Sequence, residues 1–295
     1  MLLSIMKVAV IGCGAMGVRI AGELAYHGHR VKITDIDVKA LNSVYERLQE
    51  DKKMLHSEKL MPHKNFIGQI LCMSRLEETV SDAEVIFEVV KENLNIKQDL
   101  FERISHLCKP GAIISTNTLC LNVTDISERT VNKERTIGLR FLFPVYYIPE
   151  VEITAGKHTS PETIEKVRIM LERMGKTLFF RSGGFPLILS EEERDKRKQA
   201  RLEQIQSLQS KENTIPALSH RGNVTPRVHD DDAMASSEAM DRDCAICMDR
   251  LRNCLLQPCH HMVTCYECSK MLHNRKDGCP ICRKDINNII KVYHS

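Results

Sequence analysis

Apolar runs alternate with helix-like segments along the first 186 residues. The helix-like segments cover residues 15–28, 95–109 and 160–175, and the last of these starts with Ser160 as N-cap and Pro161 at the first helical position. The apolar runs have the length and composition of strands: MKVAVI, RVKITD, AEVIFEVV, AIISTN, GLRFLFP and KTLFFRS. This alternation predicts an α/β fold built on a doubly wound sheet.

The pattern changes after residue 186. Residues 191–212 are highly charged, and Leu202, Ile205 and Leu208 form only a narrow apolar stripe. We expect a solvated helix there, with self-association as the less favoured alternative. Residues 213–240 are polar, aperiodic and contain two prolines, which indicates a flexible linker. We therefore expect a first domain over 1–186, a charged helix and linker over 187–240, and a cysteine-rich domain over 241–295.

Composition narrows the range of partners. The net charge of +3 gives no reason to expect nucleic acid or an anionic membrane. No run reaches the ~18 apolar residues of a membrane span. The start, MLLSIMKVAVIG, lacks the basic-then-apolar order of a signal peptide. We expect a soluble, cytoplasmic protein.

The 12 cysteines are distributed unevenly. Cys13, Cys72, Cys108 and Cys120 are scattered, whereas the other eight lie within residues 244–282. In an intracellular chain, tightly paired cysteines indicate metal binding rather than disulfides.

A glycine-rich turn follows the first predicted strand and opens the first helix. The motif GCGAMG places glycines at Gly12, Gly14 and Gly17, and the next predicted strand ends at Asp35, 18 residues beyond Gly17. Gly12 permits a tight turn, Gly14 lets the backbone approach a pyrophosphate, and Gly17 lets the helix pack close to the strand. Asp35 can accept hydrogen bonds from the ribose hydroxyls. The motif predicts a Rossmann-type domain that binds NAD; the alternative is such a domain that has lost its ligand.

Six stretches of residues 6–186 carry a resemblance to a known family: VAVIGCGAMGVRIA, DAEVIFEVVKENLNIKQDLFERI, STNTLCL, GLRFLFPV, EVEITAGKHTSPET and MGKTLFFRSGGF. With these stretches in the family's order, residues 6–186 resemble the NAD-binding domain of the 3-hydroxyacyl-CoA dehydrogenases. The resemblance implies that Glu92, Lys97 and Asn117 also lie along the dinucleotide.

The chain departs from this family at its catalytic motif. The family's catalytic His is the first residue of HFFNP, and Arg140 stands at that position here, with Phe143 in place of the Asn. Leu119 and Cys120 replace two serines of another family motif, whereas Glu152 retains the Glu that orients the His.

Arginine cannot replace the lost base. Oxidation of a hydroxyacyl group requires a base, and an Arg with a pKa above ~12 stays protonated. We expect Arg140 to pair with Glu152; the alternatives are that Arg140 reaches solvent or binds an anionic ligand. The helical domain that follows in the family is also replaced by the charged segment, so the resemblance implies an inactive dehydrogenase-like domain that still holds NAD.

The last predicted domain carries a regular string of metal ligands. The spacing is C-x2-C-x11-C-x-H-x3-C-x2-C-x10-C-x2-C, and it predicts two tetrahedral zinc sites. Disulfides, an iron–sulfur cluster, a zinc ribbon and another treble-clef domain are the alternatives. The spacing resembles that of RING fingers. In this family the ligand pairs interleave, which implies one site of Cys244, Cys247, Cys265 and Cys268 and another of Cys259, His261, Cys279 and Cys282.

Two neighbouring residues fall outside this ligand pattern. His260 is adjacent to His261 but does not fit the spacing, and Cys254 is expected to be a packing residue.

The RING resemblance also implies a partner surface. Ile246, Leu272 and Pro280 match the apolar groove that docks a ubiquitin-conjugating enzyme, and Arg283 matches the linchpin Arg that bridges this enzyme and ubiquitin. The tail DINNIIKVYHS resembles those of Neuralized and inhibitor-of-apoptosis proteins, in which RINGs often form homodimers with the help of the tail. The alternative for Tyr293 is an ordinary terminal aromatic residue.

Two functions from different classes follow. The first is a RING-type ubiquitin ligase with an unknown protein substrate, whose NAD-binding domain recruits substrates or senses metabolites. The second is an NAD-dependent dehydrogenase with an accessory zinc module. Arg140 argues against the second.

Overall fold

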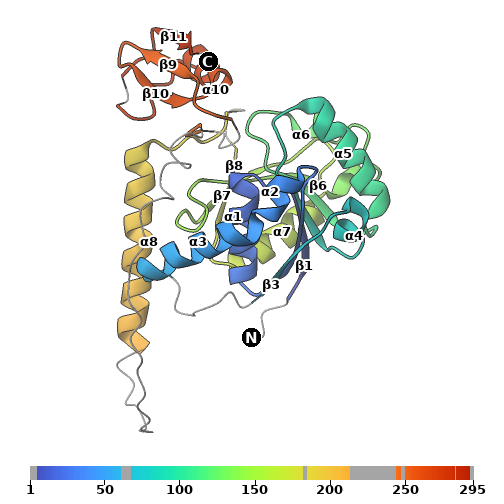
Figure 1. Ribbon diagram of the computed structural model, residues 1–295. Coiled ribbons are helices and arrows are strands. Elements are labelled where there is room, and N and C mark those ends of the chain that lie inside the picture. Colours follow the sequence, from blue (N-terminus) through green and yellow to red (C-terminus); the bar gives the residue numbers. More distant parts are fainter. Residues whose placement is uncertain are drawn as a thin grey trace, which may run out of the picture. The chain divides into compact units, whose positions relative to one another are not determined.

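The computed structural model of the 295-residue chain describes residues 5–60, 68–181, 185–212, 244–246, 250–282 and 284–292, with the backbone alone over 206–212. The predicted linker, Cys247, Arg283 and Tyr293 lie outside the described residues. The chain divides into two compact units, Met1–Leu189 and Ser190–Ser295, and we describe each by itself (Figure 1).

The first unit is built on one eight-stranded sheet in the order β3-β2-β1-β4-β5-β6-β7-β8. Neighbouring strands are parallel except for the antiparallel pair β6–β7. The order reverses between β1 and β4, which creates the crevice where doubly wound sheets bind ligands. The strands are β1 (Lys7–Ile11), β2 (Arg30–Thr34), β3 (Gln69–Cys72), β4 (Val85–Glu88), β5 (Ile113–Thr116), β6 (Thr136–Phe141), β7 (Glu150–Thr154) and β8 (Thr177–Phe180).

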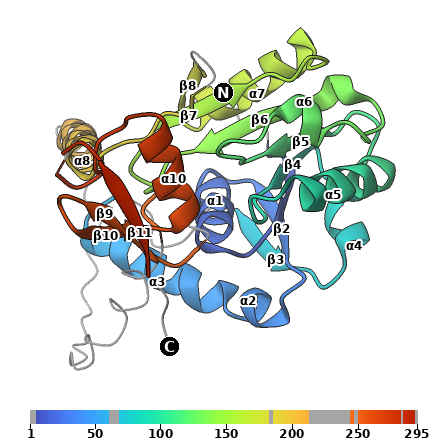
Figure 2. The same cartoon turned by 90° about the horizontal axis from the view of Figure 1, so that it is seen from above.

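Helices cover both faces of this sheet, with α1 on one face and α4 and α5 on the other (Figure 2). The prediction of an α/β doubly wound fold is confirmed. Ser160 caps its helix as predicted, since its side chain accepts a hydrogen bond from the Thr163 N–H. The helices are α1 (Ala15–Tyr26), α2 (Val38–Asn42), α3 (Val44–Ser57), α4 (Leu76–Val80), α5 (Leu94–Leu107), α6 (Val123–Ile126) and α7 (Pro161–Arg173), with a short 3-10 turn at Lys133–Arg135.

The core between α5 and the sheet is aliphatic apart from one ring. Phe101 and Ile104 of α5 are fully buried against Ala9, Ile86 and Ile114 of the central strands. Burying each large apolar side chain contributes about 1.5–3 kcal/mol. This packing holds the ends of β1 and β4 rigid at the crevice.

The second unit combines one long helix with a small zinc-finger-like domain. The helix is α8 (Glu191–Glu212), and the small domain has β9 (Cys254–Gln257), β10 (His261–Thr264), α10 (Tyr266–Asn274) and β11 (Asn288–Lys291). These strands form an antiparallel sheet in the order β10-β9-β11. Among the described residues, no helix is both long and apolar enough to cross a membrane.

Candidate cofactor and zinc sites

The glycine-rich turn lies at the crevice between β1 and β4. Gly12 has φ +112°, and a Cβ there would lie 2.6 Å from the Val89 carbonyl oxygen. A Cβ on Gly17 would lie 1.9 Å from the Gly12 carbonyl oxygen. Both positions therefore require glycine, for the turn and for close helix packing.

Gly14 differs from these two glycines. A Cβ on Gly14 would meet no described atom within 4 Å, although Gly14 is the N-cap of α1. Gly14 has no side chain that could cap the helix, so no side-chain cap satisfies the first N–H groups of α1. The donor set and the space fit the pyrophosphate of a dinucleotide.

Asp35 helps to hold the turn in shape. One carboxylate oxygen accepts the Cys13 N–H at 2.6 Å, and the other accepts the Asp37 N–H at 2.8 Å. Arg47 donates to the Cys13 carbonyl at 2.6 Å, so the Cys13 residue is held on both sides. Each carboxylate oxygen keeps a second lone pair for a ribose hydroxyl. Burial, reinforced by the Asp35 charge, raises the pKa of Cys13 to about 12, so its thiol stays protonated at neutral pH.

Glu92 and Asn117 lie in the loops after β4 and β5, and Lys97 lies in the first turn of α5. Glu92 accepts hydrogen bonds from the Leu119 and Cys120 N–H groups at 2.9 and 2.8 Å. Asn117 accepts the Phe141 N–H at 2.9 Å. Lys97 is buried and donates to Glu88 at 2.6 Å, which the sequence did not indicate. Contact of these three residues with a dinucleotide stays a prediction.

Arg140 and Glu152 lie directly opposite each other on β6 and β7. Arg140 Nε donates to Glu152 Oε2 at 2.5 Å, and both side chains are buried. Arg181 also donates to Glu152, at 3.1 Å. Burial lowers the pKa of Arg140, whereas the Glu152 charge raises it. The alternative that Arg140 reaches solvent is wrong, since Arg140 is only 8% exposed.

The segment 185–189 covers this pair. Arg140 Nη2 donates to the Leu187 carbonyl at 2.5 Å, and the Leu187 N–H donates to Glu152 at 3.3 Å. Leu189 packs with Leu142 and Ile148. Leu187 of the chain itself therefore bonds to Arg140 and Glu152, so these polar groups are not left open for a substrate.

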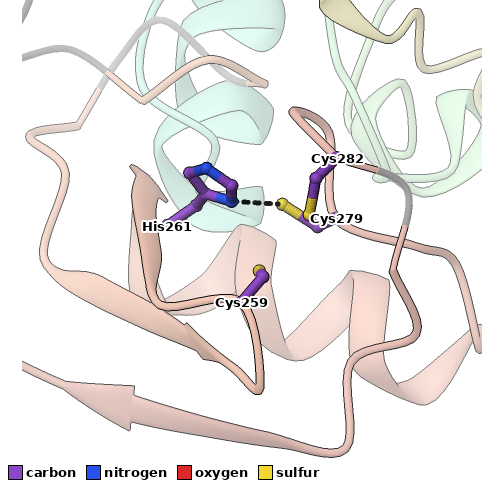
Figure 3. Close-up of side chains that lie close together, drawn as sticks. All are labelled: Cys259, His261, Cys279 and Cys282. Carbon is purple, nitrogen blue, oxygen red and sulfur yellow. Dashed lines mark hydrogen bonds between the residues drawn. The ribbon is translucent and has the colours of Figure 1, made fainter.

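The predicted zinc ligands gather in two interleaved groups. Cys259, His261, Cys279 and Cys282 have their ligand atoms within 4.8 Å of one another, and their sulfur and nitrogen atoms face a common centre (Figure 3). The Cys279 sulfur lies 3.6 Å from His261 Nδ1. Three thiols and one imidazole around one centre fit zinc.

The other group is Cys244, Cys265 and Cys268, also within 4.8 Å, and its expected fourth ligand, Cys247, is outside the described residues. His260 is exposed, and neither it nor the buried Cys254 belongs to either group. This agrees with the interleaved order of the ligand pairs.

We call Ile246, Leu272 and Pro280 the docking face, because the RING resemblance predicts that they bind a partner. Ile246 lies in the chain next to Cys244 and Pro280 in the chain between Cys279 and Cys282, which we call the two zinc loops, and Leu272 lies in α10. Ile246 is half-buried, Leu272 is 2% exposed and Pro280 is buried. The first turn of α8 contacts both loops: Arg194 Nη2 donates to the Ala245 carbonyl at 2.5 Å, and the Glu191 N–H donates to the Pro280 carbonyl at 3.3 Å. The expectation that α8 is solvated throughout is therefore wrong for its first turn.

A doubly wound sheet with a glycine turn at its crevice defines a dinucleotide-binding domain, and the interleaved ligand groups define a small zinc-binding domain. The chain belongs to the 3-hydroxyacyl-CoA dehydrogenase family through its NAD-binding domain, because the model of that domain matches residues 7–180. The model of the C3HC4-type RING finger matches residues 240–289. The resemblance to this fusion of two families is confirmed, and the corresponding cofactors are NAD and zinc.

Curated relatives and solved structures match the first unit. A probable 3-hydroxybutyryl-CoA dehydrogenase of Bacillus subtilis is 32% identical over 180 residues, which are 59% of this chain and 62% of the relative. The 3-hydroxyadipyl-CoA dehydrogenase of Escherichia coli is 29% identical over 182 residues, 60% of this chain and 38% of the relative.

The crystal structure of 3-hydroxybutyryl-CoA dehydrogenase from Escherichia coli matches with a TM-score of 0.57 at 27% identity, covering 60% of this chain and 38% of that one. This chain thus spans less than two thirds of the length of the curated relatives it matches.

Proposed function

We propose that the protein is a RING-type ubiquitin ligase whose NAD-binding domain no longer catalyses dehydrogenation and instead recruits substrates or senses NAD. The observation that supports the ligase is the interleaving of the two ligand groups. It puts Ile246 and Pro280 inside the two zinc loops, where a ubiquitin-conjugating enzyme would dock.

The chemistry of such a ligase is orientation. A substrate lysine amine attacks the thioester carbonyl of the charged conjugating enzyme, a C–N bond forms, the C–S bond breaks, and the thiolate leaves with the electron pair while the amine loses its proton to solvent. Holding these groups in a reactive geometry can contribute several powers of ten in rate. Zinc would fix the two loops, and Arg283 would hold ubiquitin through its five N–H donors.

The loss of dehydrogenase activity is supported by the surroundings of Glu152. Hydride transfer from the carbon that bears a hydroxyl needs a group that takes the hydroxyl proton. Arg140 cannot take it, and Glu152 already accepts hydrogen bonds from Arg140, Arg181 and the Leu187 N–H. The second candidate, a dehydrogenase with an accessory zinc module, is favoured by the names of the relatives, which are dehydrogenases.

Ubiquitin discharge tests the ligase. Ile246→Ala should weaken binding of the uncharged conjugating enzyme, whereas Arg283→Ala should keep that binding and slow discharge by on the order of 10²-fold. Leu251→Ala, at an exposed apolar residue of the same unit, is the matched control and should leave both unchanged. Normal discharge by both variants, with zinc content unchanged, would remove the ligase function.

Dehydrogenase activity is tested on the full chain with NAD and a short 3-hydroxyacyl-CoA. We expect no NADH above background, and Arg140→His alone should not restore activity, because Phe143, Leu119 and the covering segment 185–189 remain. Robust turnover by the unmodified protein would favour the second candidate.

Homodimerisation through the RING and its tail is a further part of the proposal. A truncation that tests it must spare β11, because Ile289 and Ile290 pair with Leu256 and Leu255 of β9. Deletion of residues 293–295 should reduce ubiquitin discharge, and a partner chain with a disabled docking face but an intact tail should restore it. Full activity of the shortened chain would exclude a role for the tail.

A further inference from the structure

The first turn of α8 is built to present donors in fixed positions. The Ser190 N–H donates to Glu193 Oε2 at 2.8 Å, and the Glu193 N–H donates to Ser190 Oγ at 3.3 Å. This reciprocal capping box fixes Ser190 as the N-cap of the helix and satisfies two terminal N–H groups. The N–H of Glu191, at the next position, is left to bond outside the helix, and it bonds to Pro280.

Two donors from one turn reach two loops that are far apart in sequence. The Glu191 N–H bonds to the carbonyl of Pro280, between Cys279 and Cys282, and Arg194 bonds to the carbonyl of Ala245, next to Cys244. The Arg194 bond is charge-assisted, which makes it the stronger of the two. Both carbonyls belong to the loops that carry Ile246 and Pro280 of the docking face.

The contact lies at the docking face, on Pro280 itself and on Ala245, the neighbour of Ile246. Pro280 is buried, Leu272 is 2% exposed, and Ile246 is half-buried. A conjugating enzyme that packs on these apolar side chains must also approach the two adjacent carbonyls, which already accept bonds from α8. Resting on the proposed ligase function, we propose that the segment Ser190–Arg194 occupies the docking face and competes with the ubiquitin-conjugating enzyme, which makes α8 an autoinhibitory element.

The competition is intramolecular, because α8 and the RING belong to one chain. A tethered segment acts at an effective concentration on the order of mM, so two hydrogen bonds are enough to oppose a weakly binding partner. Binding of the conjugating enzyme requires α8 to leave, and the apparent affinity equals the intrinsic affinity multiplied by the fraction of chains in which α8 is released.

Two substitutions remove one donor each and leave the helix intact. Arg194→Ala deletes the guanidinium, and we expect the full-length protein to bind an uncharged, broadly reactive ubiquitin-conjugating enzyme about tenfold more tightly. Glu191→Pro removes the N–H, at the N1 position that proline favours, together with the Glu191 carboxylate, and should tighten binding about threefold. Both variants should discharge ubiquitin faster than the unmodified chain.

Lys196→Ala is the matched control. It removes a cation from the exposed side of the same helix, where Lys196 pairs with Glu192 at 2.7 Å, and it should change neither binding nor discharge. Zinc content and far-UV circular dichroism of each variant verify that the RING and α8 remain folded.

The outcomes separate the inference from the function on which it rests. Tighter binding and faster discharge by both variants support autoinhibition. Binding and discharge equal to those of the unmodified chain, or weaker binding that makes α8 part of the docking surface, overturn autoinhibition and leave the ligase standing. No binding and no discharge by the unmodified chain and by both variants would instead reject the ligase function itself, and autoinhibition with it.

Discussion

Glu152 is the central residue of the buried ion pair with Arg140, which the segment 185–189 covers. It is 1% exposed and balances the charges of two arginines, Arg140 and Arg181, while it also accepts the Leu187 N–H. Charges in such a position persist only when they are paired and hydrogen-bonded. The pair is therefore a structural element that fixes β6, β7 and the covering segment together.

Glu152→Ala should consequently destabilise the first unit strongly. It leaves two buried guanidinium groups without their carboxylate, and breaking a buried ion pair costs about 3–5 kcal/mol. Urea unfolding of the full chain measures this loss. Glu172→Ala is the control, because Glu172 is an exposed partner of Arg168 and should change the unfolding free energy little. Equal stability of the two variants would contradict a structural role for Glu152.

Gly14 offers a test of cofactor binding that is independent of folding. A Cβ there meets no described atom within 4 Å, so Gly14→Ala should leave the unfolding free energy nearly unchanged. The same methyl group would stand where the pyrophosphate approaches, and NADH affinity should fall by at least about tenfold. Fluorescence titration with NADH measures the affinity, and Gly111→Ala, at another glycine with free space, is the control. Undiminished NADH affinity in Gly14→Ala would exclude this binding mode.

Single residues also mark the limit of prediction from the sequence. The glycine roles and the zinc pairs could be predicted, because short fixed spacings encode them. The bond from Arg140 to the Leu187 carbonyl spans 47 residues. It uses a backbone oxygen, which every residue type has, so the identity of residue 187 does not indicate it. The buried pair of Lys97 with Glu88 likewise depends on how α5 packs on β4, which no local pattern specifies.

At the scale of elements, α1 is joined to the loop before β8 by an ion pair. Lys176 Nζ lies 2.6 Å from Glu23 Oε1, and both side chains are buried. Burial raises the pKa of Glu23, but Lys176 and His27 outweigh it, so the pKa lies below its ordinary value of 4.5. Glu23 therefore stabilises the folded state above pH 4.5, and this contribution is lost as the pH falls through the folded pKa.

Glu23→Gln should remove this pH dependence. The variant should be less stable than the unmodified chain at neutral pH, because Lys176 loses its carboxylate, and it should lose less stability on acidification. Urea unfolding at a series of pH values between neutrality and the acid range measures both effects. Parallel pH profiles of the variant and the unmodified protein would show that Glu23 does not carry the effect.

Elements differ in how far the sequence predicts them. Six strands of the first unit and α7 follow from periodicity and capping residues, and the structure has them where the patterns predict. The patterns did not indicate β3 and β7, which are strands of only four and five residues. The helix α8 was also predicted, but its charged composition indicated solvent on all sides. Its first turn contacts loops about 50 and 90 residues further along the chain, and long-range contacts made by a helix end leave no periodic signal.

At the scale of the whole molecule, the two units should respond differently to loss of zinc. A zinc finger of this size has a small core, so metal binding contributes much of its folding free energy. A chelator should therefore unfold the RING and abolish ubiquitin discharge, while NADH binding by the first unit, whose core contains none of the predicted zinc ligands, should persist. Loss of NADH binding together with zinc would contradict this independence.

Zinc stoichiometry tests the ligand assignment within the same molecule. The unmodified chain should contain two zinc ions, as the interleaved groups predict. His261→Ala removes the imidazole that lies 3.6 Å from the Cys279 sulfur and should lose one ion. His260→Ala changes an exposed neighbour that belongs to neither group and should lose none. Elemental analysis of the purified variants measures the content. One zinc in the unmodified chain, iron in place of zinc, or equal losses in the two variants would overturn the interleaved assignment, and with it the geometry that places Ile246 and Pro280 in the two zinc loops.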